Sequence, residues 1–180
     1  MTDHHPLLSG YAVWLEPAES HRATLRSLVN RLAEEQPPAL RFEPHVTLYH
    51  PVALDRPLDA VVASLRSLAS HVKGQLRLEL LPAQGGQHYY QSVLAPVVPD
   101  EALLALRAAA EASWGPIEKP YFAHLSLLYG DLDHERRAGI ARGVNELRAL
   151  PKALELDSVV LVRAVGRADE WEVVHREALG

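Results

Sequence analysis

The chain has 180 residues, 48% of them hydrophobic and 23% charged, with a formal net charge of −5 and no cysteine. This balance is typical of a globular domain and excludes disordered and fibrous classes, while the lack of cysteine excludes disulfides, thiolate metal ligands and a thiol nucleophile. The acidic charge disfavours long nucleic acid as a partner, because such binding needs many Lys and Arg to neutralise phosphates.

Neither a membrane-spanning segment nor a secretory signal is expected. No apolar run approaches the roughly 18 residues that cross a bilayer. The first ten residues, MTDHHPLLSG, lack a basic segment followed by an apolar one. We therefore expect a cytoplasmic protein without a membrane partner.

The first half of the chain predicts the order β-α-β-α-β. Two segments carry apolar residues at helical spacing, and β-rich or alternating runs surround them. The first helix stops at Gln36-Pro37-Pro38. The expected elements are a strand at 10–16, a helix at about 19–35, a strand at 42–50, a helix at about 58–73 and a strand at 75–82.

The second half predicts the same order with one extra strand. Gly115-Pro116 ends its first helix, and a turn at Gly166 separates the last two strands. The expected elements are a strand at 88–97, a helix at 100–114, a strand at 121–130, a helix at about 133–150 and strands at 153–165 and 170–178.

The chain also matches itself when it is shifted by 79 residues without a gap. This shift carries His45 onto His124 and Thr47 onto Ser126, and the register holds from the first strand through the second helix. Such a match indicates a duplicated unit.

We expect one α+β domain over residues 1–180, built as two similar lobes. The halves that form the lobes are approximately 1–84 and 87–180, with exchange of strands between lobes allowed. Antiparallel-rich sheets should face a central cleft with the helices outside.

The two strands that contain histidine each have one polar face. Residues i and i+2 of a strand share a face, so His45 lies beside Thr47 and His124 beside Ser126. Strict alternation sends His50 to the face opposite His45. If an approximate twofold axis relates the two copies, both polar faces line one cleft.

Two imidazoles and two hydroxyls suit the hydrolysis of a phosphodiester without a metal or a thiol. In-line displacement needs a base for the attacking water and an acid for the leaving oxygen, and histidines with pKa near 6.5 serve both roles. The hydroxyls of Thr47 and Ser126 would donate hydrogen bonds to the phosphoryl oxygens, where charge develops.

The motifs HVTL and HLSL resemble the paired His-x-Thr/Ser signature of the 2H phosphoesterase superfamily. The wider context resembles its cyclic phosphodiesterase branch, known from plants and yeast; the similar stretches are YAVWLEP, FEPHVTL, YYQ at 89–91, PYFAHLSLLYGDL and EWEVV. The paired imidazoles and hydroxyls are self-consistent without a cofactor, and the resemblance implies a bilobal fold with the cleft between the lobes. It implies hydrolysis of ADP-ribose 1'',2''-cyclic phosphate and of nucleoside 2',3'-cyclic phosphates, the latter opened to 2'-phosphates.

The resemblance also implies roles for individual residues. His124 would be the base and His45 the acid, and Thr47, Ser126 and Tyr129 would bind the phosphate. Strict alternation sends Tyr129 to the face opposite His124. Its role therefore requires the strand to end or twist before that residue.

Three further residues are candidates for contacts with a base or ribose. Trp14, Tyr90 and Gln91 are expected on strands that border the cleft, where Trp14 would stack on a base; a core position is the alternative for each. No spacing of metal ligands such as His-Glu-x-x-His occurs, so no metal site is expected.

Two other functions stay open from the sequence. One keeps the chemistry but acts on RNA ends or 2',5'-linked oligonucleotides, and the other is a nucleotide-binding module without catalysis. The leading hypothesis is a monomer that hydrolyses a small cyclic nucleotide.

Overall fold

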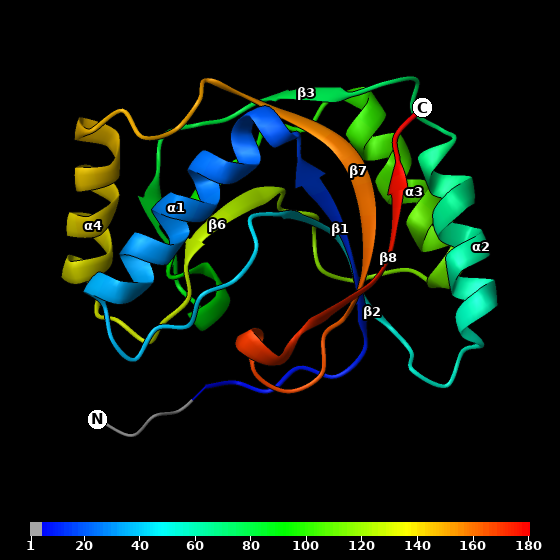
Figure 1. Ribbon diagram of the computed structural model, residues 1–180, viewed down its shortest axis with the longest axis horizontal. Coiled ribbons are helices and arrows are strands. Elements are labelled where there is room, and N and C mark those ends of the chain that lie inside the picture. Colours follow the sequence, from blue (N-terminus) through cyan, green and yellow to red (C-terminus); the bar gives the residue numbers. More distant parts are fainter. Residues whose placement is uncertain (1–4) are drawn as a thin grey trace.

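The computed structural model describes residues 5–180, which form an α+β fold with one antiparallel sheet of eight strands (Figure 1). In the first half the elements are β1 (Tyr11–Pro17), α1 (Glu19–Glu35), β2 (Val46–Val52), α2 (Leu58–Ala69), β3 (Leu76–Glu79) and β4 (Gln84–Gly85). In the second half they are the 3-10 turn η1 (Tyr89–Gln91), β5 (Val93–Pro96), α3 (Glu101–Trp114), β6 (His124–Leu128), α4 (His134–Glu146), β7 (Ala153–Arg163), the 3-10 turn η2 (Ala168–Glu170) and β8 (Glu172–Ala178).

The two halves share this sheet, whose strand order is β3-β7-β1-β2-β6-β5-β4, with β8 paired to β7. Strand β7 belongs to the second half but lies between β3 and β1 of the first half. The histidine strands β2 and β6 are neighbours and pair at Val46 and Leu125. The duplicated elements therefore meet at the strands that carry the two motifs.

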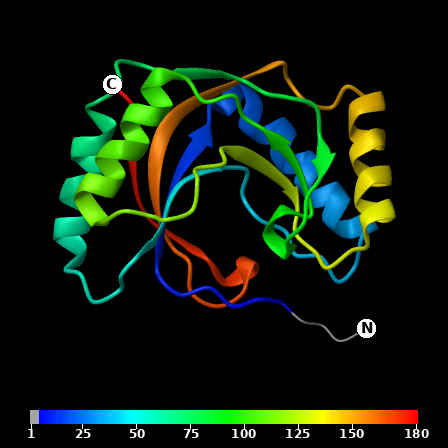
Figure 2. The same cartoon turned by 180° about the vertical axis from the view of Figure 1, so that it is seen from behind.

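The helices lie outside the sheet, as predicted. Figure 1 shows α1 and α4 at one end of the molecule and α2 and α3 at the other, and Figure 2 shows the same division from behind. Helix α1 packs against β6, whereas α3 packs against β2, so each half covers the histidine strand of the other half. This exchange confirms the α+β class and places both motifs in the centre.

The core forms because apolar positions fall on one side of each element. Leu25, Leu28 and Leu32 of α1 recur at helical spacing and are buried, and Val46 and Leu48 of β2 are buried against the same core. Burial of such side chains removes apolar surface from water and is the main stabilising contribution to the fold.

Several predicted elements differ from the structure; the helix expected at about 58–73, for example, ends at Ala69. The sequence predicts a strand at residues 89–91, but they form the turn η1, closed by a bond from the Gln91 N–H to the His88 carbonyl. This turn allows the ring of Tyr90 to pack against Tyr129 and Trp171. The last long helix ends at Glu146 instead of about 150, because Arg148 adopts a positive φ of 50° that no helix continues.

In the described part of the chain, every helix is too short or too polar to cross a membrane.

Candidate active site

His45 lies immediately before β2 and is held on three sides. Its Nδ1 donates to the carbonyl oxygen of Glu43 at 2.7 Å, since a carbonyl can only accept. The imidazole is stacked on Trp14 with ring centroids 3.7 Å apart, and the edge of Phe42 lies nearby. The side chain is only 4% exposed. These contacts fix the ring and leave Nε2 as the nitrogen for chemistry.

His124 repeats this arrangement at the start of β6. Its Nδ1 donates to the carbonyl oxygen of Phe122 at 2.8 Å, again two residues earlier, and its ring is stacked on Phe122. The backbone bond selects the same tautomer as in His45. Both imidazoles therefore present Nε2.

Burial keeps both imidazoles neutral in the free protein. It lowers the pKa of His45 from 6.5 to about 4, opposed by the bond to Glu43 and assisted by repulsion from His124. Burial also lowers the pKa of His124, opposed by the bond to Phe122. The sequence predicts ordinary pKa values near 6.5 for both histidines. The shifts could not be predicted, because burial depends on the tertiary structure.

A β-bulge in β2 brings a third histidine to the same side. Trp14 pairs with Thr47, but the preceding Val13 pairs with Tyr49, so Leu48 is an extra residue in β2. Leu48 and Tyr49 consequently both face the main core, and the alternation reverses. The prediction that His50 faces away from His45 is wrong: His50 lines the same pocket.

A matching bulge in β6 places Tyr129. Leu94 pairs with Ser126 and Val93 with Leu128, so Leu127 is the extra residue, and Leu127 and Leu128 both face the core. Strand β6 ends at Leu128, and Tyr129 turns to the side of His124. This is the break in alternation that a role for Tyr129 requires.

The pocket between the histidine strands has a volume of about 260 Å³. It brings together seven of the eight residues selected from the sequence: His45, Thr47, Tyr90, Gln91, His124, Ser126 and Tyr129. Leu8, Ala12, His50, Ala164 and Trp171 complete the wall. None of these residues is Lys or Arg, so within this wall only a protonated imidazole can supply positive charge to an anion.

The hydroxyls differ in their present partners. Ser126 Oγ donates to the Tyr90 carbonyl at 2.9 Å, so it must rotate to donate to a phosphate. Half-buried Thr47 lines the same pocket. Burial raises the pKa of Tyr129, and a hydrogen bond with Ser126 opposes that rise. The phenol of Tyr129 therefore stays protonated and able to donate at neutral pH.

Trp14 is the one selected residue outside this pocket. It lies behind His45 and lines a neighbouring groove of about 380 Å³ together with Trp171. His45 covers one face of its ring, and the residue as a whole is only 4% exposed within a small core cluster that includes Val160, which is the core position named as the alternative. The sequence reasoning missed Trp171, which borders both spaces, although the stretch EWEVV contains it.

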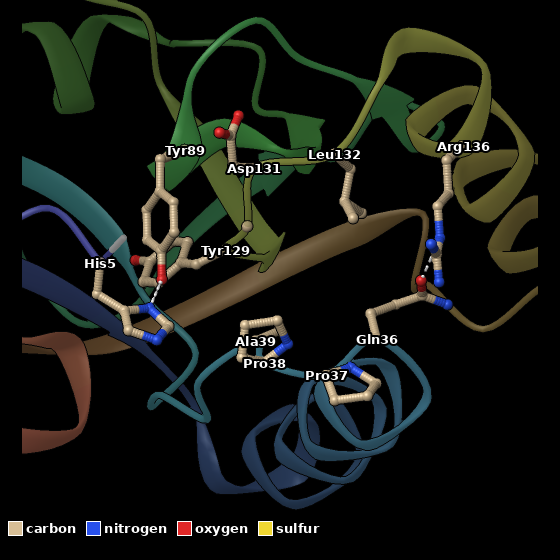
Figure 3. Close-up of a pocket in the computed structure, with 11 residues that line it drawn as sticks. His5, Gln36, Pro37, Pro38, Ala39, Tyr89, Tyr129, Asp131, Leu132 and Arg136 are labelled. Atoms are coloured by element: carbon tan, nitrogen blue, oxygen red, sulfur yellow. Dashed lines mark hydrogen bonds between the residues drawn. The ribbon is translucent and has the colours of Figure 1, made fainter. Parts of the chain in front are cut away.

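A second cavity, of about 180 Å³, adjoins the pocket through Tyr129 (Figure 3). Pro37, Pro38 and Leu132 form part of its wall, and the figure shows their side chains around a central space. Two hydrogen bonds cross its ends, one between His5 and Tyr89 and one from Arg136 to Gln36.

Within residues 5–180, no group of three or more His, Cys, Asp or Glu side chains is placed to hold a metal ion.

Comparison with known proteins identifies the family. Residues 9–179 match the family described as cyclic phosphodiesterase-like protein. The chain belongs to this family. Membership confirms the resemblance to 2H phosphoesterases that the motifs HVTL and HLSL indicated.

Solved structures similar to this family member share its fold. The protein TT0787 of Thermus thermophilus is 16% identical with a TM-score of 0.59, over 94% of this chain and 97% of that one. LigT of E. coli, complexed with 3'-AMP, is 15% identical with a TM-score of 0.54, over 95% and 98% of the two chains. Membership of the family supports a phosphodiesterase-type enzyme. A search of curated proteins found no match.

Proposed function

We propose that the protein hydrolyses small cyclic phosphodiesters on ribose, namely nucleoside 2',3'-cyclic phosphates and ADP-ribose 1'',2''-cyclic phosphate, without a metal. The observation that carries this proposal is the pair of imidazoles, each held by Nδ1, with two hydroxyls in one pocket. A single chain supplies both motifs, so the proposed active unit is a monomer.

In the proposed reaction, one imidazole takes a proton from water as the water oxygen bonds to phosphorus. The bond from phosphorus to one ribose oxygen breaks, and the other, protonated imidazole gives that oxygen its proton. The products are a phosphomonoester and a free hydroxyl, and exchange with solvent restores the starting protonation of both histidines. By analogy with the family, His124 is the base and His45 the acid; because burial lowers the pKa of His45 to about 4 in the free protein, this assignment requires the bound anion to raise the pKa of His45.

Binding of the anionic substrate favours the state with one protonated and one neutral imidazole. Both imidazoles are neutral beforehand, and the negative phosphodiester favours protonation of one of them. Thr47, Ser126 and Tyr129 would donate to the non-bridging oxygens, where charge develops. Tyr90 and Gln91 are the proposed contacts to ribose and base, whereas buried Trp14 supports the ring of His45 and would contact a base only after it becomes exposed.

The test is hydrolysis of nucleoside 2',3'-cyclic phosphates and of ADP-ribose cyclic phosphate in excess chelator. We expect turnover by the wild type and a loss of about two or more orders of magnitude in His45→Ala and His124→Ala, because each removes a proton-transfer group. His71→Ala is the matched control, since exposed His71 makes the same type of Nδ1 bond to a carbonyl, that of Ser67.

Three results contradict the proposal: loss of all activity in chelator, full activity in either variant, or tight nucleotide binding without turnover. The last result indicates a binding module. Thermal unfolding of each variant shows whether lost activity reflects lost folding.

A longer substrate, such as an RNA end or a 2',5'-linked oligonucleotide, is the second candidate. The cavity beside Tyr129 favours it, because a second nucleotide could enter there. The same assay decides between them with an oligonucleotide that carries the same cyclic end. A preference above about tenfold for the longer substrate, worth about 1.4 kcal/mol, supports this candidate.

A further inference from the structure

We propose that His50 contacts the substrate at the position equivalent to Tyr129 and selects which of the two ester oxygens leaves the phosphorus. This inference rests on the proposed function and adds a specificity residue to it.

The duplication places His50 and Tyr129 at equivalent positions. The 79-residue shift that carries His45 onto His124 also carries His50 onto Tyr129. It further carries the extra residue of one bulge, Leu48, onto the extra residue of the other, Leu127. Each histidine strand thus presents a histidine, a hydroxyl and a third side chain to one pocket, in the same order.

At this position His50 has a buried ring nitrogen that lacks a hydrogen-bond partner. Its imidazole lines the pocket, yet its Nε2 is buried and has no hydrogen-bond partner among the described residues. A buried nitrogen without a hydrogen-bond partner destabilises the free protein. A ribose hydroxyl or a phosphoryl oxygen of the substrate would supply that partner.

The third position is where the two strands differ most. The first position is histidine in both strands, and the second differs only by the methyl group of Thr47 over Ser126. At the third position, one strand has the imidazole of His50 and the other has the phenol of Tyr129, which is larger and reaches further. A site with equal halves would accept a cyclic phosphate in two orientations, related by exchange of the 2' and 3' oxygens. A difference between the halves is needed to favour one orientation.

The experiment assigns the product of nucleoside 2',3'-cyclic phosphate hydrolysis for the wild type, His50→Tyr and His50→Phe. His50→Tyr makes the third positions identical, and His50→Phe removes the nitrogens. We expect one isomer to dominate for the wild type and the ratio of isomers to move at least about tenfold toward equality in both variants. Tyr49→Phe, on the core side of the same strand, is the control and should keep the wild-type ratio within about twofold.

A second measurement covers the case in which the wild type does not turn over. Calorimetric affinities for nucleoside 2'- and 3'-monophosphates should differ in the wild type and converge in the His50 variants, while Tyr49→Phe keeps the difference. Absence of turnover alone refutes the proposed function and leaves this comparison to decide on His50. An unchanged ratio in folded His50 variants, or no discrimination by the wild type in either measurement, overturns the inference.

Discussion

At the scale of single residues, burial and the backbone bond act on each imidazole in opposite directions. Burial lowers the pKa of His45 to about 4 and also lowers that of His124, whereas the carbonyls of Glu43 and Phe122 oppose both shifts. Catalysis by an acid and a base needs one protonated and one neutral imidazole. The fraction of protein in that state is largest between the two pKa values.

We therefore expect kcat/KM, which reports the free protein, to peak below pH 6.5. Above the higher pKa, the protonated imidazole is lost and kcat/KM should fall about tenfold per pH unit. The pH optimum of kcat should lie higher, because the bound anion raises the pKa of both imidazoles. A pH-rate profile checks this, and a kcat/KM that rises up to pH 9 would contradict it.

The control for that profile is the free energy of unfolding at each pH. A histidine whose pKa is 6.5 when unfolded and about 4 when folded binds more protons in the unfolded state between these values. The contribution of His45 to the free energy of unfolding is therefore fully present above pH 6.5, and about 3 kcal/mol of it is lost as the pH drops to 4. Rates below the pH at which unfolding begins must be left out of the profile.

At the scale of elements, side chains of the second half hold the bulge in β2. Buried Arg107 of α3 donates to the Leu48 carbonyl at 2.6 Å, and the hydroxyl of Tyr121 donates to the Thr47 carbonyl at 3.1 Å. Arg107 also binds Glu111, one turn later in the same helix. These bonds satisfy consecutive carbonyls where the register shifts, and so support the direction of His50.

Arg107→Met should lower the free energy of unfolding by about 2 kcal/mol. The change removes a charge-assisted bond to a buried carbonyl, and such bonds contribute roughly 1.5–3 kcal/mol. Arg31→Met is the matched control, because Arg31 forms an i, i+4 pair with Glu35 on an exposed helix face, and exposed helix pairs contribute only about 0.5 kcal/mol. Chemical denaturation of both variants measures the difference; equal losses would show that Arg107 does not support the bulge.

At the scale of the whole molecule, neither half of the chain completes its own part of the sheet. Strand β3 pairs only with β7 among the described strands, and β7 also pairs with β1. Helices α1 and α3 each cover the histidine strand of the other half. The pocket therefore exists only when both halves are present.

A chain divided between the exposed residues Gln87 and His88 tests this dependence. We expect fragments 1–87 and 88–180 to lack cooperative unfolding when each is expressed alone, because β1 and β3 then expose unpaired edges. Co-expressed fragments should assemble and recover nucleotide binding. Circular dichroism and calorimetry measure both properties, and a cooperative transition in either isolated fragment would show that a half folds independently.

Much of this arrangement can be predicted from the sequence, because it follows from repetition and periodicity. The shift of 79 residues identifies both motifs, and apolar spacing indicates the helices and most strands. The bulges at Leu48 and Leu127 cannot be predicted, since an extra apolar residue in an apolar strand leaves the pattern nearly unchanged. Strict alternation consequently places His50 on the wrong face. Residues 89–91 form a turn because aromatic packing across the chain outweighs their preference for strands.

The stacking of Trp14 on His45 also has a spectroscopic consequence. The two rings are nearly parallel, with an interplanar angle of 7°, and a protonated imidazole in contact with an excited indole quenches its emission. The protein thus contains an intrinsic fluorophore whose intensity reports the charge of His45 without a chemical label. Subtracting the spectrum of Trp14→Phe removes the background from Trp114 and Trp171, so that titration and substrate binding can be followed by light alone.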